Sequence, residues 1–324
     1  MRLKSYIVGC TCFTHAIKRR KTTLITINTE KQLVRVADWT DIMERAGFTD
    51  DLDPNQHELK SIIGRYAFKD KLRCGLSSCH TLHNRGYIVA TKSGLETNIG
   101  KDCGKKHFGV DFNDMSRQFE RDVTEKENRE TLWSFHFRLD DILQTIDCIR
   151  RANRGADWIY KRSQPLLEIN KGCPVRIVRC IGDLIKNGSN IVTVPRLATK
   201  EEVDTEEARI GHPVQRPAYV DEPVGQIADL SVLYQENNLR NILILDLEAQ
   251  CKVLAELDVD IMTYEQLSYW VKWVGTVDEK LQRAQDIVET GRRFFSAQNL
   301  SCLSRLVSNG DDVQAFNTFL KTLA

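Results

Sequence analysis

The pattern of apolar and polar positions divides the chain into a mixed front part and a longer helical part. The run TTLITIN at residues 22–28 is rich in β-branched residues, which predicts a strand. A threonine typical of helix caps follows it, and we expect a helix over residues 29–46, ended by a glycine. A second, short helix is expected over residues 54–63, where a proline opens the element.

Further along the chain, apolar residues recur at intervals of three and four, which places them on one stripe of a helix. They are Leu132, Phe135, Leu139, Ile142, Ile146 and Ile149. The stripe predicts either packing within a helical bundle of this chain or the seam of a homodimer.

The helical pattern breaks after residue 190. Four of the seven prolines lie within residues 191–224, together with an acidic cluster, which predicts a loop or an irregular β excursion. The cluster consists of Glu201, Glu202, Asp204, Glu206 and Glu207. It is either a solvated face or a mimic of nucleic acid that covers the basic front of the chain.

Helix start signals return after residue 225. Two pairs match the capping box, in which the N-cap hydroxyl and the third helical side chain each bond the other's backbone amide. The pairs are Thr263 with Gln266 and Thr276 with Glu279. These signals predict a helical C-terminal domain.

Composition adds a charge asymmetry that the formal net charge of +1 hides. Residues 1–109 hold 19 Lys and Arg against 11 Asp and Glu, so the front is basic and the remainder acidic. There is no run of about 18 apolar residues that would span a membrane, and the N-terminal residues lack the apolar core of a secretory signal. We expect a cytoplasmic, intracellular protein without a membrane partner, in which clustered cysteines hold metal.

The order of elements around four cysteine and histidine residues predicts such a metal site. Cys74 and Cys79 lie in a loop that contains glycine and serine. Residues 87–91 and 95–99 have the pattern of a two-stranded hairpin, and a helix is expected to begin after Gly100.

Cys103 and His107 are four residues apart, so on that helix they face the same side and can bind one ion together. With Cys74 and Cys79 they complete a tetrahedral set of sulfur and nitrogen donors, which favours zinc over hard cations. Four protein ligands leave no open position for water. The sequence therefore predicts one structural Zn²⁺ and no catalytic residue there.

The first ligand pair leaves alternatives open. Four residues separate Cys74 from Cys79, where two are more usual, so His80 or His83 could replace one predicted ligand. The same histidines raise the alternative of a His-finger nuclease, in which a histidine at the end of the first strand activates water. Both histidines precede the strand, and we do not favour this alternative.

This succession of knuckle, hairpin and helix resembles the treble-clef zinc finger. It is similar to short treble-clef modules of phage and bacterial proteins of unassigned role. The resemblance covers residues 70–110. It implies a zinc-stabilised fold for that module and nothing for the rest of the chain.

A second metal site is a further alternative. Cys10, Cys12 and His15 could form part of it, with Cys173 and Cys180 completing it in three dimensions. Otherwise these cysteines are buried thiols.

Basic residues gather around the predicted zinc module. Residues 60–109 carry a net charge of +7, interleaved with Tyr66, Phe68, Tyr87 and Phe108. This composition is typical of phosphate contacts with base stacking. The predicted nucleic-acid contacts are Lys18, Arg19, Arg20, Lys21, Arg73, Arg85, Lys101, Lys105 and Lys106.

These patterns predict an α+β fold that is mostly α. Residues 1–110 form a mixed, basic region that contains the zinc module at 70–110. Residues 111–190 form a helical region, residues 191–224 the irregular excursion, and residues 225–324 the C-terminal helical domain.

The sequence holds no Gly-rich phosphate loop, nucleophile elbow, dinucleotide fingerprint or HExxH motif. We therefore expect a non-enzymatic binding protein that contacts nucleic acid through the basic module and protein partners, or a second copy, through its helices. Two alternatives stay open. The first is a scaffold protein in which zinc is only a folding staple, and the second is an unrecognised nucleic-acid-processing enzyme.

Overall fold

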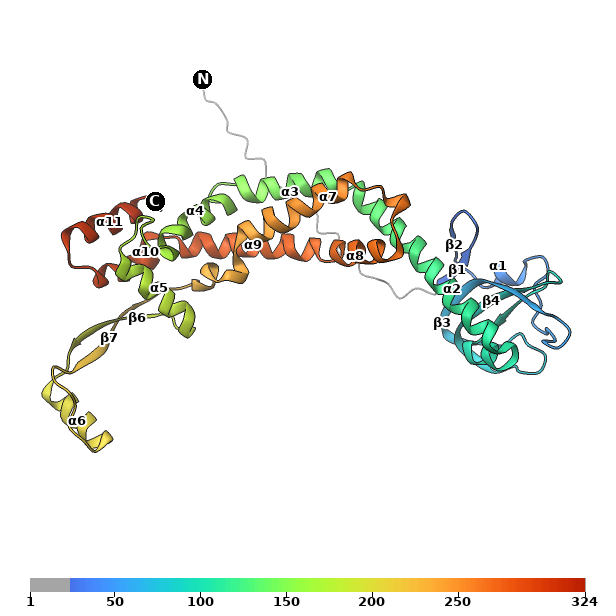
Figure 1. Cartoon of the computed structure of the whole chain (residues 1–324), viewed down its shortest axis with the longest axis horizontal. Coiled ribbons are helices and arrows are strands. Elements are labelled where there is room, and N and C mark those ends of the chain that lie inside the picture. The colour runs from blue at the N-terminus through green and yellow to red at the C-terminus, as the bar shows by residue number, and fades with distance from the viewer. Residues whose placement is uncertain (1–23, 324) are drawn as a thin grey trace, which may run out of the picture. The chain divides into compact units, whose positions relative to one another are not determined.

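The computed structural model describes residues 24–323, which form two compact units (Figure 1). The sheet unit extends to Glu127, and the helical unit begins at Asn128. One long helix, α2 (Lys101–His136), contributes residues to both units. A small antiparallel sheet and a majority of helices confirm the expected α+β, mostly α fold.

A five-stranded antiparallel sheet forms the centre of the sheet unit, in the order β2-β1-β3-β4-β5. The strands are β1 (Leu24–Asn28), β2 (Leu33–Val36), β3 (Leu59–Arg73), β4 (Leu82–Thr91) and β5 (Glu96–Ile99). Side chains alternate between the two faces of a strand. On one face Tyr87 packs with Phe112 and Phe119 of α2, and on the other Tyr66 packs with Trp39.

Several sequence predictions for this unit are confirmed. The described part of the predicted strand 22–28 is β1, the predicted hairpin is β4 with β5, and α2 begins directly after Gly100. The predicted helix over residues 29–46 is wrong, because the chain forms β2 and then a single-turn helix, α1 (Thr40–Met43).

The cause of that error lies at Thr29. Its hydroxyl bonds the carbonyl and the amide of Gln32, at 2.6 and 3.1 Å, and so closes the turn between β1 and β2. Threonine stabilises turns and helix caps by the same local bond. The short helix expected over residues 54–63 is also wrong, because Leu59 already pairs with Thr91 in the sheet.

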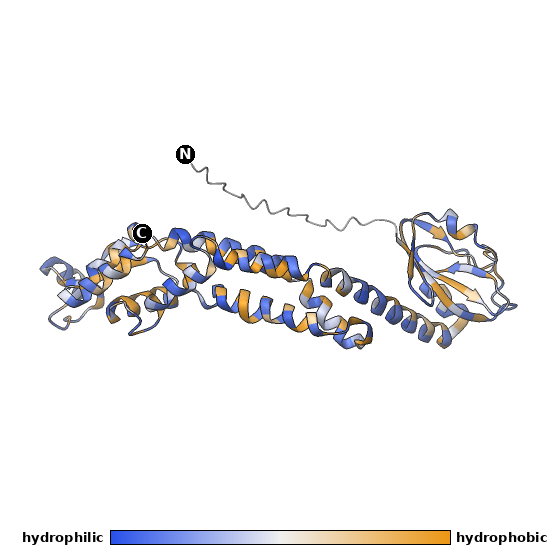
Figure 2. Cartoon of the chain, turned by 90° about the horizontal axis from the view of Figure 1, so that it is seen from above, coloured by the Kyte–Doolittle hydropathy of each residue, from blue (hydrophilic) through white to orange (hydrophobic). Residues whose placement is uncertain are grey.

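The helical unit surrounds one large apolar core, and Figure 2 shows hydrophobic residues alternating with hydrophilic ones along its long helices. Its main helices are α3 (Leu139–Arg151), α4 (Ala156–Leu167), α5 (Val175–Asn187), α7 (Ala249–Glu256), α8 (Tyr264–Val274), α9 (Val277–Phe294), α10 (Ala297–Leu300) and α11 (Gly310–Lys321). Shorter segments are η1 (Leu230–Leu233), η2 (Gln235–Asn237), the π-helical η3 (Asn241–Glu248), η4 (Val259–Ile261) and η5 (Ser301–Leu306).

The predicted apolar stripe lies in this core. All six of its residues are buried there, on the last turns of α2 and on α3. They pack against other residues of the same chain, which is the first of the two alternatives, packing within a helical bundle. The capping box of Thr263 with Gln266 is confirmed, whereas the one expected at Thr276 is wrong, since the Thr276 hydroxyl donates to the Trp273 carbonyl instead.

Residues 191–226 form an arm that projects from the helical unit (Figure 1). β6 (Ile191–Leu197) and β7 (Tyr219–Gln226) pair as a two-stranded antiparallel ribbon, and α6 (Lys200–Ile210) lies at its tip. The predicted β excursion is thus present, but the acidic cluster forms a helix with its own capping box, Thr199 with Glu202.

Two helical glycines test the packing of the helical unit. A Cβ at Gly291 of α9 would lie 2.6 Å from the Ile159 side chain of α4, whereas a Cβ at Gly182 of α5 meets nothing within 4 Å. Gly291→Ala is expected to destabilise the unit by about 1–2 kcal/mol, the cost of overpacking less the gain in helix propensity. Gly182→Ala, the control, is expected to be neutral or stabilising by up to about 1 kcal/mol.

Urea unfolding followed by far-ultraviolet circular dichroism measures both effects. Equal effects of the two substitutions would contradict the close packing of α4 on α9.

Candidate metal centre

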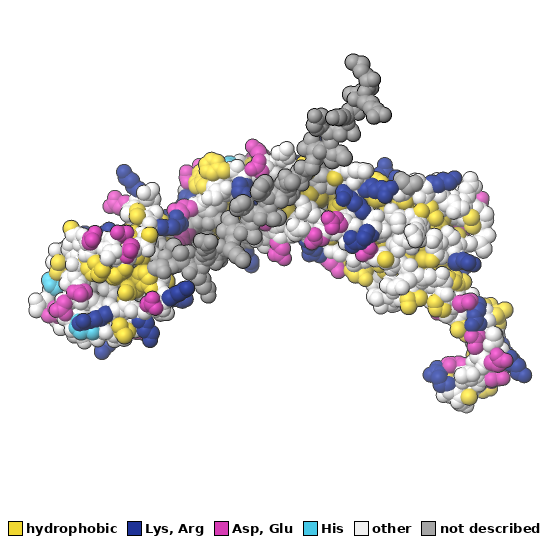
Figure 3. All heavy atoms as spheres, turned by 180° about the vertical axis from the view of Figure 1, so that it is seen from behind, with side chains coloured by type: hydrophobic (Ala, Val, Ile, Leu, Met, Phe, Trp, Pro, Cys, Tyr) yellow, Lys and Arg dark blue, Asp and Glu magenta, His cyan; other side chains and the backbone are white. Residues whose placement is uncertain are grey.

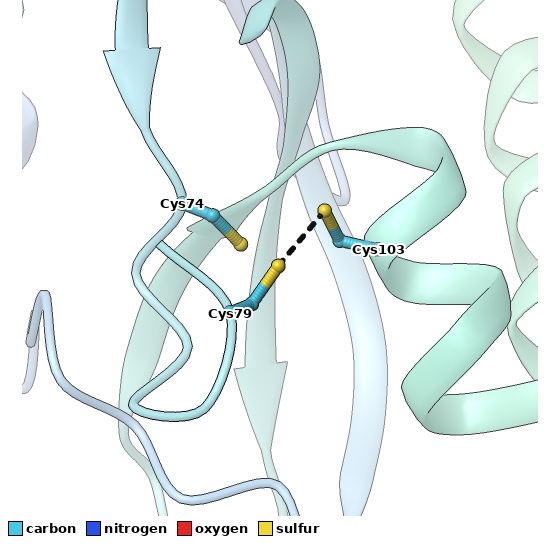
Figure 4. A group of neighbouring side chains, drawn as sticks. All are labelled: Cys74, Cys79 and Cys103. Carbon is cyan, nitrogen blue, oxygen red and sulfur yellow. Dashed lines mark hydrogen bonds between the residues drawn. The ribbon is translucent and has the colours of Figure 1, made fainter. Parts of the chain in front are cut away.

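Three thiols, two from the loop between β3 and β4 and one from α2, converge in the sheet unit. Cys74 directly follows β3, Cys79 lies in the loop before β4, and Cys103 lies in the first turn of α2. The side chains point toward one another (Figure 4), and their Sγ atoms all lie within 4.8 Å of one another. The Cys79 and Cys103 Sγ atoms are 3.3 Å apart. Such a group can hold a metal ion.

The loop that carries the first two thiols is fixed against the hairpin. The Gly75 amide donates to the Asn98 carbonyl at 2.8 Å, and the Cys79 amide donates to the Leu76 carbonyl at 3.0 Å. A Cβ on Gly75 would lie 2.1 Å from the Thr97 hydroxyl. Only glycine therefore allows the loop to lie so close to β5, and this contact places Cys74 beside the start of α2.

A second glycine positions the helix. A Cβ on Gly104 would lie 2.3 Å from the Phe112 ring. α2 is interrupted at Gly109, whose φ of 65° and ψ of −141° are not helical. The break turns the chain so that Phe112 packs over Gly104, one residue after Cys103.

The three thiols differ in pKa because their surroundings differ. Burial raises the pKa of Cys74, and burial together with the neighbouring thiols raises the pKa of Cys103 to about 12. Burial also opposes ionisation of Cys79, but hydrogen bonds with the Thr81 hydroxyl and backbone outweigh it and lower its pKa to about 7. A bound cation would favour all three thiolates at once.

Three histidines near the group differ in their surroundings. His107 follows Cys103 by one helical turn and is not part of the three-thiol group, but its Nε2 is buried and has no hydrogen-bond partner among residues 24–323. His83 Nδ1 is 2.9 Å from the Tyr66 hydroxyl, and its Nε2 is likewise buried without a partner in that range. His80 lies 3.4 Å from the Cys74 carbonyl and 3.9 Å from the Asp51 carboxylate.

The hydrogen bonds that hold Tyr66 and His83 beside the thiols were not predicted from the sequence. The Asn98 amide donates to the Tyr66 hydroxyl and to the Arg73 carbonyl, at 3.4 and 2.8 Å. Asn98 lies within the strand expected over residues 95–99, but Thr97, Asn98 and Ile99 are all buried, so the alternation of strand side chains does not single out Asn98.

The proposed second site is not formed by the described residues. Cys10, Cys12 and His15 lie outside residues 24–323. Within that range the three thiols are the only group of metal-binding side chains, and Cys173 and Cys180 belong to the core of the helical unit.

The predicted cations near the thiols are exposed and unpaired. Arg73, Arg85, Lys101, Lys105 and Lys106 are exposed, and within the described chain none has a carboxylate within ion-pair distance. Lys18, Arg19, Arg20 and Lys21 lie outside the described residues.

The predicted stacking aromatics are less accessible than the cations. Tyr66 and Tyr87 are buried in the two faces of the sheet unit, and Phe68 and Phe108 are half-buried. Base stacking on Tyr66 or Tyr87 is therefore excluded by burial.

Comparisons of the chain with protein-family models, with curated proteins and with solved structures find no match. No helix within residues 24–323 is long and apolar enough to cross a membrane.

The unequal thiols lead to a prediction for the reduced, metal-free protein. Since the pKa of Cys79 is lowered to about 7, its thiolate forms as the pH rises through about 7, whereas Cys103, with a pKa of about 12, stays protonated. Alkylation by iodoacetamide near pH 8, followed by mass spectrometry, is expected to label Cys79 at least about tenfold faster than Cys103.

Cys148, an exposed thiol of α3, is the control, because its alkylation rate is that of a thiol accessible to solvent. Equal labelling of Cys79 and Cys103 across the pH range would contradict the described environments.

Proposed function

We propose that this chain is a non-enzymatic binding protein, in which one structural Zn²⁺ holds a basic surface in shape for contact with nucleic acid. The observation that carries the proposal is the convergence of three thiols within 4.8 Å, beside exposed cations that lack carboxylate partners in the described chain. The helical unit is proposed to bind protein partners or a second copy.

The donor set supports zinc as the metal. Thiolates are soft ligands that suit zinc and suit Mg²⁺ or Ca²⁺ poorly. Cys74, Cys79 and Cys103 would supply three ligands. His107 is the proposed fourth, because it follows Cys103 by one turn of α2 and its Nε2 is buried without a partner among the described residues. When bound, the ion neutralises thiolate charge and links the β3–β4 loop to α2.

The small size of the sheet unit explains why a metal would matter. Its sheet separates two modest apolar clusters, so neither face has a large core. Small folds of this kind often depend on a metal for part of their folding free energy.

Removing one thiol tests the metal. Wild-type protein is expected to contain one zinc per chain by plasma mass spectrometry, because the described residues form one metal-binding group. Cys103→Ser is expected to lose at least about nine-tenths of the metal and to increase hydrogen exchange in β4 and β5 about tenfold or more. Cys148→Ser, which changes an exposed thiol, is expected to keep the metal. Full zinc content in Cys103→Ser would contradict the proposed site.

The cations support nucleic-acid contact through their placement. Arg73 directly precedes Cys74, and Lys101, Lys105 and Lys106 surround Cys103 in the first turns of α2. Lys101 and Lys105 are one helical turn apart and share a face. The elements that the metal would fix therefore carry the cations that would meet phosphates.

Charge reversal tests this contact. We expect Lys101→Glu, Lys105→Glu and Lys106→Glu together to weaken binding to a short labelled DNA or RNA by about tenfold or more in fluorescence anisotropy. The dependence of log affinity on log salt should become shallower by about 2–3, one unit for each lost phosphate contact.

The matched control reverses three exposed lysines of the helical unit, Lys161, Lys186 and Lys321, and so changes the total charge equally. An equal loss in both variants would assign binding to net charge alone. Absence of wild-type binding at about 50 mM salt would contradict nucleic-acid contact and leave the metal as a folding staple of a scaffold protein.

A further inference from the structure

The arm (residues 191–226) is only thinly covered by its own unit. α6 has one buried residue, Val203, and β7 has none. Val192, Val194 and Val224 anchor the base of the arm in the core. Two-stranded ribbons and helices of this length are marginally stable alone in water, so a contact that covers the arm would stabilise it.

The tip of the ribbon presents an apolar pair on one face. Leu197 lies directly opposite Tyr219, and each is 62% exposed. The next pair on the same face is Pro195 with Asp221, because strand side chains alternate between faces. This face therefore joins an exposed apolar surface to a carboxylate.

The arm carries more negative charge than its own cations balance. Residues 191–226 hold seven Asp and Glu against four Lys and Arg. Figure 3 shows acidic and basic side chains together at the tip of the arm. Arg196 pairs with Glu202 and Glu222, Arg209 with Glu206, and Arg216 with Glu207. Glu201, Asp204 and Asp221 have no ion-pair partner among the described residues.

The N-terminal segment of the chain has the complementary composition. Residues 1–23 hold six Lys and Arg and no Asp or Glu. Apolar side chains lie between these cations, namely Tyr6, Ile7, Val8, Phe13 and Ile17. Opposite charge attracts the two surfaces, and the apolar residues supply the area that a stable contact requires.

We infer that residues 1–23 of a second copy dock on the arm. The cations of the segment lie against Glu201, Asp204 and Asp221, and its apolar residues cover the pair of Leu197 and Tyr219. The arm projects from the helical body in two views (Figures 1 and 3), so a segment bound at its tip links one chain to the next. Exchange of a segment between identical chains is a low-cost route to assembly.

This inference does not rest on nucleic-acid binding, since it needs only the two charged surfaces. If both hold, Lys18–Lys21 cannot contact the arm and phosphates at once, and self-association competes with nucleic acid.

Isotope-mixed cross-linking tests the contact. Equal amounts of light and ¹⁵N-labelled full-length chain are mixed, treated with a carbodiimide that joins amines to carboxylates, and digested. Links from Lys4, Lys18 or Lys21 to the three unpaired arm carboxylates are expected, about half of them between a light and a heavy chain, as pairing between copies requires.

Sedimentation supplies a second readout. The average mass of the wild type is expected to rise with concentration and to fall toward the monomer in about 0.5 M salt, where charge attraction is screened. Glu201→Gln, Asp204→Asn and Asp221→Asn together should abolish the rise in mass. The control variant, Asp183→Asn, Glu256→Gln and Asp312→Asn, removes equal charge elsewhere on the helical unit and should keep both the links to the arm and the rise in mass.

Three results would each overturn the inference. The first is links found only within one isotope, and the second is an arm variant that sediments as the wild type does. The third is links to residues 38–53 in place of the arm, since that segment holds six Asp and Glu against one Arg.

Discussion

Three thiols whose Sγ atoms lie within 4.8 Å of one another, two of them buried, cannot all ionise unless a cation balances them. This constraint connects the parts of the sheet unit. The β3–β4 loop lies against β5 because Gly75 has no side chain, and α2 begins beside it with Phe112 folded over Gly104. Each close contact brings a thiol toward the same point, so the position of the proposed ion follows from the packing.

The same packing decides which chemistry the surface can offer. Tyr66 and Tyr87 are buried on the two faces of the sheet, and Arg65 is paired with Glu120 and Glu127 of α2. The exposed cations around Cys74 and Cys103 remain accessible to a partner. In the helical unit the apolar stripe is buried within the chain, whereas the arm exposes both apolar and charged side chains.

The sequence predicted those features that depend on long or repeated patterns. The six-residue stripe, the β4–β5 hairpin and the start of α2 each rest on several residues that agree. Single-residue signals were less dependable. Thr29 and Thr276 both resemble helix caps, yet their hydroxyls donate hydrogen bonds to the carbonyls of Gln32 and Trp273. A threonine hydroxyl can bond any nearby backbone group, and tertiary packing decides which group lies within reach. The spacing of Cys103 and His107 predicted a shared helix, but the buried surroundings of His83 could not be foreseen from spacing.

X-ray absorption at the zinc edge of the purified, reduced protein tests the central claim most directly. The proposed site predicts a first shell of three sulfurs at about 2.3 Å and one nitrogen at about 2.0–2.1 Å, with no room for a water oxygen. A shell of oxygen and nitrogen only, or one with fewer than three sulfurs, would contradict the account that Cys74, Cys79 and Cys103 hold the metal together.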